Sequence, residues 1–349
     1  MKIITCASYY ASGSSALTDL VAEYSNVKDM TEYEFRFLHD IDGVSDLEHH
    51  LVEVHNRHNS GHALKRFLKL SKFNAGTFFN ARYEPFFDNQ YMKLTNEYID
   101  ALTDFTYNGW WFYDLYDKGK AYYYTVQLIN KILAKTKLTK HDLSLNETTY
   151  CSHPSEKKFL ECTRDYVSKL MHAANKENKE FLEIDQILPS QNIERVLRYI
   201  KDDISVFVVD RDPRDIFMCL RVYRDLVAPS DVNDFCNWYN YTRESGSGEV
   251  YNDPRIKKIH FEDLIYNYDA TVAEIEGFLG LNSEDHIDKF KKLNPKRSVH
   301  NTQIWKRPGM NADEDIKIIE ERCAKYLYPF DSVKENAISG IDVKDSSVF

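Results

Sequence analysis

Short apolar runs alternate with helix-like segments along both ends of this chain. "KIITCA" predicts a buried strand, and the segment after it carries Leu17, Leu20 and Val21 at helical spacing. The same order returns in "ISVFVVD", a β-branched and aromatic run whose periodic segment begins after Pro213. Three more runs have strand character: "YEFRFL" at 33–38, "KEFLEID" at 179–185 and "RIKKIH" at 255–260. Strands alternating with helices predict an α/β fold whose parallel sheet is flanked by helices.

The middle of the chain breaks this alternation. Residues 45–180 read as mostly helical and polar-aromatic, and we interpret them as a helical insertion. Ser45 and Glu48 form a capping-box signature ahead of "LEHHLVEVHNRH", a predicted histidine-rich helix. The aromatic tract at 105–124 is interpreted as buried packing, with stacking on sugar rings as the alternative. We expect one α/β domain over 1–330, including the insertion, followed by a polar tail at 331–349.

Composition narrows the possible partners. The 349 residues carry a formal net charge of −10, which opposes a general nucleic-acid binder but permits a small polyanionic ligand. The six cysteines form no C-x-x-C pair and have no histidine at zinc spacing, so we expect neither a disulfide framework nor a metal. We read no signal peptide and no apolar run of membrane-spanning length. These features predict a cytoplasmic protein with no transmembrane segment and with reduced thiols.

The loop after the first strand has the composition of an anion-binding turn. In "YYASGSSA", Gly13 stands among the small hydroxyl residues Ser12, Ser14 and Ser15. A strand-to-helix loop of this kind can offer backbone amides to a phosphate. It lacks the lysine of the nucleotide P-loop pattern G-x-x-x-x-G-K-[ST]. The alternative is a tight turn without a ligand.

A second loop adds a cation at the same edge of the predicted sheet. "VVDRDPRD" places Arg211 at the carboxyl end of a strand, where ligands of parallel sheets bind. Arginine is always charged and suits bidentate phosphate binding. The alternative is an ion pair with Asp210 or Asp212. Two such loops together would fit a nucleotide that carries phosphates at two positions.

Four segments, in order, resemble those of the sulfotransferase superfamily, which uses 3′-phosphoadenosine 5′-phosphosulfate (PAPS). "ASGSS" resembles the 5′-phosphosulfate loop, "RDPRDIFMC" the 3′-phosphate motif, and "IHFEDLI" the family's Tyr-Glu-Asp-Leu segment. "NPKRSVHNTQIWKR" lies where the family has a basic loop over the 3′-phosphate. The resemblance covers roughly 1–40 and 180–330, and bacterial-type carbohydrate sulfotransferases are the most similar.

This resemblance implies a P-loop-like sheet, PAPS as the sulfuryl donor and 3′-phosphoadenosine 5′-phosphate (PAP) as the product. It implies a hydroxyl acceptor, by family habit a carbohydrate or polysaccharide, with acceptor specificity in 45–180. The family's transfer needs no metal. The cofactor-binding residues that the resemblance implies are Ala11, Ser12, Gly13, Ser14, Ser15, Arg211, Cys219, Arg297 and Ser298, with Asn301 as a further polar partner.

The candidate catalytic residues come from a narrower resemblance. Tyrosylprotein sulfotransferases carry a Glu-x-Arg at a similar distance from the loop, which would make Glu34 the general base and Arg36 a transition-state cation. The alternative is an edge-strand glutamate paired with its arginine. Asp185, Asp40 and the histidines near 49–62 are further candidates for the base, although a solvated helix face also explains the histidines.

Two residues depart from the family pattern. Ala11 stands where a lysine or arginine is expected, and Cys219 stands where a serine is expected. Arg36 could replace the missing cation, and so could three residues of the insertion: Lys65, Arg66 and Arg82. The departures keep open a catalytically degenerate nucleotide-binding scaffold. A P-loop phosphotransferase is the third reading, and the absence of a loop lysine disfavours it.

Overall fold

The computed structural model describes the chain except for residues 78, 110–112, 137–141, 224–226, 245–252 and 333–349. The chain divides into two compact units. Unit 1 comprises Met1–Arg36, Asn175–Arg198 and Asp202–Phe349, and unit 2 comprises Phe37–Ala174 with Tyr199–Lys201. Most of the predicted insertion thus lies in unit 2. The predicted extent of a single domain, 1–330, stays a prediction.

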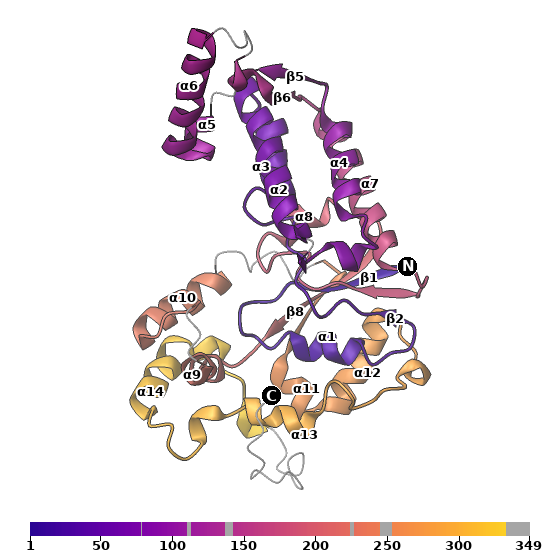
Figure 1. Ribbon diagram of the computed structural model, residues 1–349. Helices are drawn as coiled ribbons and strands as arrows, with labels where there is room; N and C mark the ends of the chain where they lie inside the picture. The colour runs from indigo at the N-terminus through magenta and orange to yellow at the C-terminus, as the bar shows by residue number, and fades with distance from the viewer. Residues whose placement is uncertain (78, 110–112, 137–141, 224–226, 245–252, 333–349) are drawn as a thin grey trace. The chain divides into compact units, whose positions relative to one another are not determined.

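Unit 1 is built on a five-stranded parallel sheet in the order β2-β7-β1-β8-β9 (Figure 1). From β1 the chain forms β2 and then β7 on one side, and it crosses to the other side for β8 and β9. This reversal makes the carboxyl end of β1 a topological switch point, where ligands of open α/β sheets bind. The strands are β1 (Lys2–Cys6), β2 (Val27–Lys28), β7 (Phe181–Glu183), β8 (Asp203–Asp210) and β9 (Ile256–His260).

The helices of unit 1 follow the strands, as the alternating pattern predicts. The first core cluster joins alternate residues of β8, Phe207 and Val209, to Leu17 and Leu20 of α1 and to α11 and α12. A second core cluster unites α9, α10 and α14. The helices are α1 (Ser15–Val21), α8 (Ile193–Leu197), α9 (Pro213–Tyr223), α10 (Val232–Glu244), α11 (Phe261–Tyr266), α12 (Tyr268–Leu279), α13 (Pro295–Ser298) and α14 (Asp313–Arg322).

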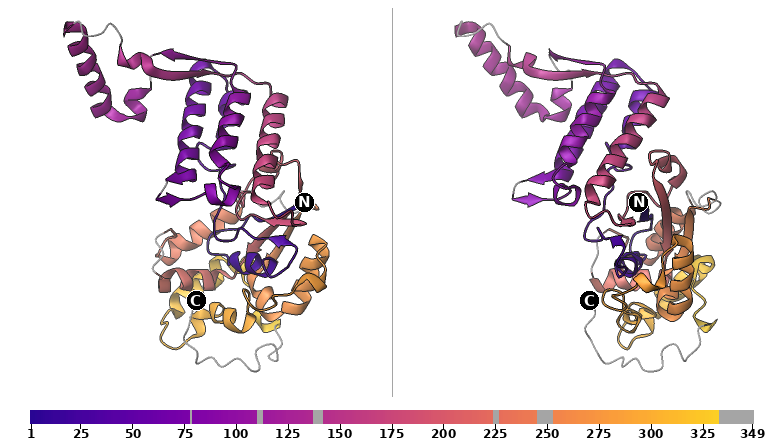
Figure 2. Two further views of the ribbon diagram at one scale, coloured as in Figure 1. Left: turned by 45° about the vertical axis from the view of Figure 1, so that its right-hand side comes forward. Right: turned by 90° about the vertical axis from the view of Figure 1, so that its right-hand side faces the viewer.

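Unit 2 is mainly helical, with α3, α4 and α7 running alongside one another (Figure 2). Its core is aromatic: Tyr98 and Tyr166 stack at 4.6 Å between ring centroids, and both rings are buried. The helices are α2 (Val44–Glu48), α3 (Arg57–Ala75), α4 (Tyr91–Leu102), α5 (Asp114–Asp117), α6 (Gly119–Thr136) and α7 (Glu156–Ala174). Two antiparallel ribbons complete the unit: β3 (Gly76–Thr77) with β4 (Asn80–Ala81), and β5 (Phe105–Gly109) with β6 (Glu147–Cys151).

The predicted fold class is confirmed: the sheet is parallel, helices flank it, and a helical insertion interrupts it. The expected strand at 33–38 is wrong. Within that stretch only Glu34 pairs, in a single parallel bridge with Asp185, and the neighbouring strand is β2 instead. Phe35 and Phe37 are both buried, which explains the alternation of apolar and polar residues. No strand forms, because the chain passes from unit 1 to unit 2 between Arg36 and Phe37.

Three expectations for unit 2 also need correction. The histidine-rich helix is not continuous: a π-helical turn at His49–Glu53 follows α2, and Asn56 then caps α3. Ser45 is not the N-cap, because its hydroxyl donates to the carbonyl of Leu38. The described aromatic residues at 105–124 are largely exposed, Tyr116 by 74%. The β5–β6 ribbon has only two strands, and β5 is exposed along most of its length.

Candidate functional site

The loop between β1 and α1 adopts a conformation that depends on its glycine. Ala11 and Gly13 have positive φ angles of 58° and 79°. A Cβ atom on Gly13 would also lie 2.7 Å from the Phe261 ring, so only glycine fits against that side chain. Phe261 opens α11 in the "IHFEDLI" segment. The first and third of the four sequence segments therefore meet here.

Arg211 belongs to the second segment and bonds a residue of the fourth, so these two segments join the same cluster. Its Nη1 donates to the carbonyl of Ala11 at 3.3 Å, and its Nη2 donates to the carbonyl of Asn301 at 2.5 Å. The guanidinium carbon lies 5.0 Å from the centre of the Phe261 ring. Arg211 is 5% exposed. This residue thus ties the serine-rich loop, the strand β8 and the basic turn after α13 to one another.

A buried carboxylate holds the basic turn against α9. Asp215 accepts from the amides of Gln303 and Ile304 at 2.9 and 2.8 Å. Burial raises the pKa of Asp215 to about 7, although the charge of Arg211 and the two amides act in the opposite direction. Asn301 is fixed two residues before this anchor, which explains why its carbonyl reaches Arg211.

Three polar atoms of the cluster are buried and have no hydrogen-bond partner among the described residues. They are Ser12 Oγ, Arg211 Nε and Asn301 Oδ1. Ser12 is 1% exposed. A buried polar group without a partner costs about 1–3 kcal/mol, and such groups in a folded protein call for an explanation. A bound polyanion would give Ser12 and Arg211 the acceptors that they lack.

The remaining predicted cofactor residues lie around this cluster with different surroundings. Cys219 and Ala11 pack against the same apolar cluster of α9, α10 and α14. Ser14 precedes α1 and Ser15 begins it. Arg297 and Ser298 belong to α13, where the exposed Arg297 donates to the carbonyl of Lys292 at 2.9 Å. The structure therefore brings Arg211 directly onto the loop, while it turns the Arg297 guanidinium toward Lys292.

A buried cation that the sequence did not single out also adjoins the loop. Arg243 of α10 is 2% exposed and binds Asp210 through Nη2 at 3.0 Å. Its guanidinium carbon lies 4.3 Å from the ring of Tyr9, a loop residue, and 3.5 Å from the ring of Tyr239. Burial acts to raise the pKa of Asp210, but the charges of Arg243 and Lys258 lower it below its usual value. No motif surrounds position 243, so sequence reasoning missed this residue.

Two candidate bases, Glu34 and Asp185, lie side by side at the carboxyl edge of the sheet and form the carboxylate pair of the site. Their main chains form an isolated parallel bridge, and the amide of Phe35 donates to the Asp185 carbonyl at 2.9 Å. The amide of Gln186 donates to Cys6, the last residue of β1, so the pair stands beside the start of the loop. Burial, and after it the charge of Glu34, raises the pKa of Asp185 to about 7. Glu34 itself is exposed.

Arg36 lies 3.9 Å from Glu34, measured from Nη1 to Oε2, and both side chains are exposed. An ion pair of Glu34 with Arg36 was the alternative to a catalytic role, and the roles of both residues stay predictions. The two substitute cations from α3 are engaged within unit 2: Lys65 pairs with Glu147 and Arg66 with Asp42. The third, Arg82, covers the ring of Phe73 at 4.2 Å.

Unit 2 contains a separate polar cavity of about 200 Å³. Its lining includes the carboxylates of Asp42 and Asp46, the imidazoles of His50 and His62, and the exposed ring of Tyr116. Nδ1 of His50 is buried without a partner among the described residues, and burial lowers the pKa of His50. Such a set of acceptors and donors suits a ligand with several hydroxyl groups.

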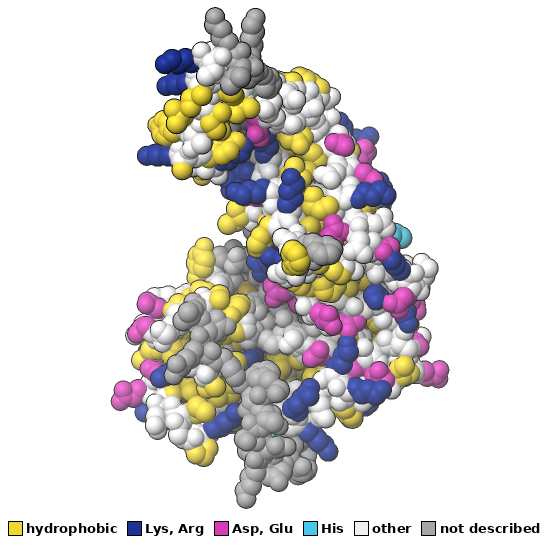
Figure 3. All heavy atoms as spheres, in the orientation of Figure 1, with side chains coloured by type: hydrophobic (Ala, Val, Ile, Leu, Met, Phe, Trp, Pro, Cys, Tyr) yellow, Lys and Arg dark blue, Asp and Glu magenta, His cyan; other side chains and the backbone are white. Residues whose placement is uncertain are grey.

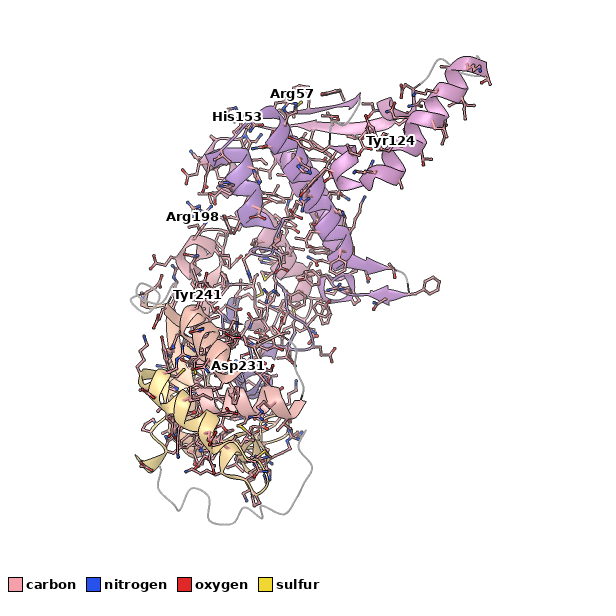
Figure 4. All side chains as sticks on the ribbon, turned by 90° about the vertical axis from the view of Figure 1, so that its left-hand side faces the viewer. Arg57, Tyr124, His153, Arg198, Asp231 and Tyr241 are labelled. Carbon is pink, nitrogen blue, oxygen red and sulfur yellow. The ribbon has the colours of Figure 1, made fainter. Side chains whose placement is uncertain are left out.

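The other histidines of this region make contacts within unit 2, and His49 and His58 are exposed. His49 bonds Glu53 at 2.9 Å, and His55 stacks on His153 with ring centroids 3.6 Å apart. His58 meets the edge of the Tyr113 ring at 6.5 Å. His153 and Arg57 are labelled in Figure 4. Only His50 and His62 line the polar cavity, so they are the histidines with access to a ligand there.

Comparison with protein-family models and with curated protein sequences gave no match. Among solved structures, a retinol dehydratase in complex with androsterone and inactive cofactor PAP is similar, with a TM-score of 0.32 and 14% identity. The match covers 96% of this chain and 83% of that chain. A likeness of this size shows neither the family nor the activity of this chain.

Proposed function

We propose that the protein is a sulfotransferase that moves a sulfuryl group from PAPS to a hydroxyl acceptor, a carbohydrate. One observation carries the proposal: Arg211 bonds Ala11 and Asn301, which lie 200 and 90 residues away in sequence. Four segments that resemble sulfotransferase motifs are thereby gathered at the switch point of a parallel sheet. Buried polar atoms without partners lie in the same cluster.

Each group in the cluster has a role in this proposal. Ser12 and the backbone of the loop bind the 5′-phosphosulfate, and Arg211 binds the 3′-phosphate with help from Arg297 and Ser298. Cys219 occupies the position of the family's serine and contributes packing rather than a strong hydrogen bond. Arg243 supplies the positive field that Ala11 cannot, since its buried guanidinium adjoins the loop at Tyr9.

The carboxylate pair supplies the base. Glu34 takes the proton of the acceptor hydroxyl while the new oxygen–sulfur bond forms and PAP leaves. Asp185 has a pKa of about 7, so below that pH it holds a proton and limits the negative charge beside Glu34. Arg36 balances the charge of Glu34 from the exposed side. Catalysis then rests on positioning and charge stabilisation, as in phosphoryl transfer.

The polar cavity of unit 2 supports a carbohydrate acceptor. Its carboxylates and imidazoles can bond sugar hydroxyls, and Tyr116 offers a ring for stacking. This cavity lies in the region where the resemblance places acceptor specificity. Shortening Asp46 to alanine should therefore raise the KM for the polysaccharide acceptor and leave the KM for PAPS unchanged.

Thermal stabilisation by PAP tests the proposal. A ligand that binds only the folded chain stabilises it by RT ln(1 + [L]/Kd), so 1 mM PAP should raise Tm by several degrees if Kd is about 10 μM. ADP, and ATP with magnesium, should raise Tm less. Arg211→Lys keeps the charge but loses the fork of donors, and it should reduce the PAP shift. Arg221→Ala removes an exposed arginine of α9, the helix that follows Arg211. Arg221 pairs with Asp315, and its loss should keep the shift.

Three outcomes would count against the proposal. A Tm shift with ATP and magnesium alone would indicate a phosphotransferase. No Tm shift with any nucleotide would show that the cluster around Arg211 is not a donor site. A PAP shift without transfer to any polysaccharide would leave a nucleotide-binding scaffold, the reading that Ala11 and Cys219 favour. Release of PAP from PAPS, measured with and without acceptor, separates that scaffold from the enzyme.

A further inference from the structure

Helix α6 in unit 2 carries apolar side chains that no described part of the chain covers. Tyr124, Leu128 and Ile132 are 61%, 59% and 50% exposed, and none of the described residues of this helix is buried. They stand four residues apart and therefore lie along one face. Figure 4 labels Tyr124 on this helix, and Figure 3 shows hydrophobic side chains there beside Lys or Arg side chains.

The opposite side of α6 is fixed by contacts within unit 2. Asn130 donates to Asp142 at 2.5 Å and accepts from the amide of Leu143 at 2.9 Å. At the start of the helix, Lys118 bonds Glu147 of β6 at 2.8 Å. These contacts set the rotation of α6, so the stripe of Tyr124, Leu128 and Ile132 faces outward because the helix is already held from behind.

The charged residues of α6 itself are of one sign. Residues Gly119–Thr136 include no aspartate or glutamate, although the whole chain has a net charge of −10. Lys131 and Lys135 follow Tyr124 by about two and three turns and border the stripe on one side. The described lysines of α6 are Lys120, Lys131 and Lys135.

We propose that α6 docks the protein on an anionic lipid bilayer. The apolar stripe enters the boundary between headgroups and acyl chains, the lysines bind lipid phosphates, and the tyrosines lie at headgroup depth. The helix lies on the membrane rather than across it, since no described helix is long and apolar enough to span one. A second copy of the chain fits less well, because pairing α6 with itself would oppose two lysine-rich segments. This surface does not depend on the proposed reaction.

Vesicle flotation with the full chain tests the surface. We expect the protein to float with phosphatidylcholine vesicles that contain 30% phosphatidylglycerol. Pure phosphatidylcholine, or 0.5 M NaCl, should weaken binding by about tenfold or more, since screening removes the attraction of the lysines. Ile132→Asp should weaken binding by about tenfold, because a charge replaces an apolar anchor. Lys131→Glu/Lys135→Glu should remove the preference for phosphatidylglycerol.

Matched variants elsewhere separate this surface from general effects of charge. Ile287→Asp makes the same change at a side chain that is 65% exposed in unit 1, and it should not alter flotation. Lys93→Glu/Lys157→Glu changes the net charge as the α6 double variant does, from the exposed surfaces of α4 and α7, and it should bind normally. Failure to float with phosphatidylglycerol would overturn the proposal. Equal flotation of the wild type and Ile132→Asp would also overturn it, as would a dimer that Ile132→Asp dissociates and that binds no vesicles.

Discussion

The two units differ in which side chains they bury and which they expose. In unit 1 the charged groups near the sheet are buried and fixed by main-chain contacts: Arg211 bonds two carbonyls and Asp215 binds two amides. In unit 2 the core is a set of packed tyrosines, while lysines and apolar side chains of α6 are exposed. A rigid polar cluster suits a small charged ligand of fixed geometry. An exposed amphipathic helix suits a large and deformable surface.

The buried ion pair of unit 1 should give the largest loss of stability. Arg243→Leu leaves Asp210 buried with only Lys258 as a cation, and breaking a buried pair in this way costs about 3 kcal/mol. Urea unfolding should show the loss as a lower midpoint. Lys258→Ala removes the less buried partner and should cost less than about 1 kcal/mol. Equal losses in the two variants would contradict the claim that Arg243 is the main partner of Asp210.

Replacement of the loop glycine, Gly13, should give the next largest loss of stability. Gly13→Ala requires a positive φ angle and a Cβ in contact with the Phe261 ring, at a cost of about 2 kcal/mol. The same variant should lose PAP binding, because the loop must shift. Gly277→Ala is the matched control: it lies within α12, its Cβ meets nothing within 4 Å, and it should be stabilising by up to about 1 kcal/mol. A neutral Gly13→Ala would mean that the loop is not held as described.

Asp185 of unit 1 and Asp165 of unit 2 contribute to the free energy of unfolding, and the two contributions should change with pH in opposite directions. Asp185 has a folded pKa of about 7, above its ordinary value of 3.8, so its contribution to stability falls as pH rises from about 4 to 7. Asp185→Asn should therefore gain stability relative to wild type as pH rises through this window. Glu34→Gln should lower the pKa of Asp185 and flatten the same dependence.

Asp165 of unit 2 is the control for this sign. A hydrogen bond from Lys169 lowers the pKa of Asp165, so its contribution is present at neutral pH and fades as pH falls through the folded pKa. Asp165→Asn should lose stability relative to wild type at pH 7 and approach wild type at low pH. Unfolding free energies measured from about pH 2.5 to pH 7 cover both trends, because the folded pKa of Asp165 lies below its ordinary value of 3.8. Parallel trends in Asp185→Asn and Asp165→Asn would refute the assignment.

The smallest effect on folding belongs to α6. Ile132→Asp should change the free energy of unfolding by no more than about 0.5 kcal/mol, since the side chain is half exposed and surface substitutions are mild. Circular dichroism and urea unfolding together check this. A loss above 2 kcal/mol would show that part of the chain buries Ile132, and the surface described for α6 would then be wrong.

Sequence patterns predicted those parts of the molecule that depend on local order. The runs at β1 and β8, each followed by a helix, predicted the parallel sheet, and Gly13 and Arg211 lie at the carboxyl edge of its strands, where we propose the donor site. The alternation in 33–38 misled, because Phe35 and Phe37 are buried in different units and no ladder forms. Arg243 was missed because its partners, Asp210 and the ring of Tyr9, are distant in sequence. The roles of Glu34 and Arg36 stay predictions.

The exposure of α6 shows a second limit of such patterns. Its apolar residues recur at helical spacing, as they do in any helix that packs on a core. Periodicity reports that a helix has an apolar face and says nothing of what covers it. Only the contacts of Asn130 on the other side of the helix show which face remains open.

Titration calorimetry with PAP and with adenosine 5′-phosphate tests the central claim most directly. If Arg211, with Arg297 and Ser298, forms the site of a 3′-phosphate, PAP should bind at least about tenfold more tightly, because a charge-assisted contact to a phosphate contributes about 1.5–3 kcal/mol. In Arg211→Lys this preference should shrink while the affinity for adenosine 5′-phosphate stays the same. Equal affinity of the wild-type protein for the two nucleotides would contradict the account.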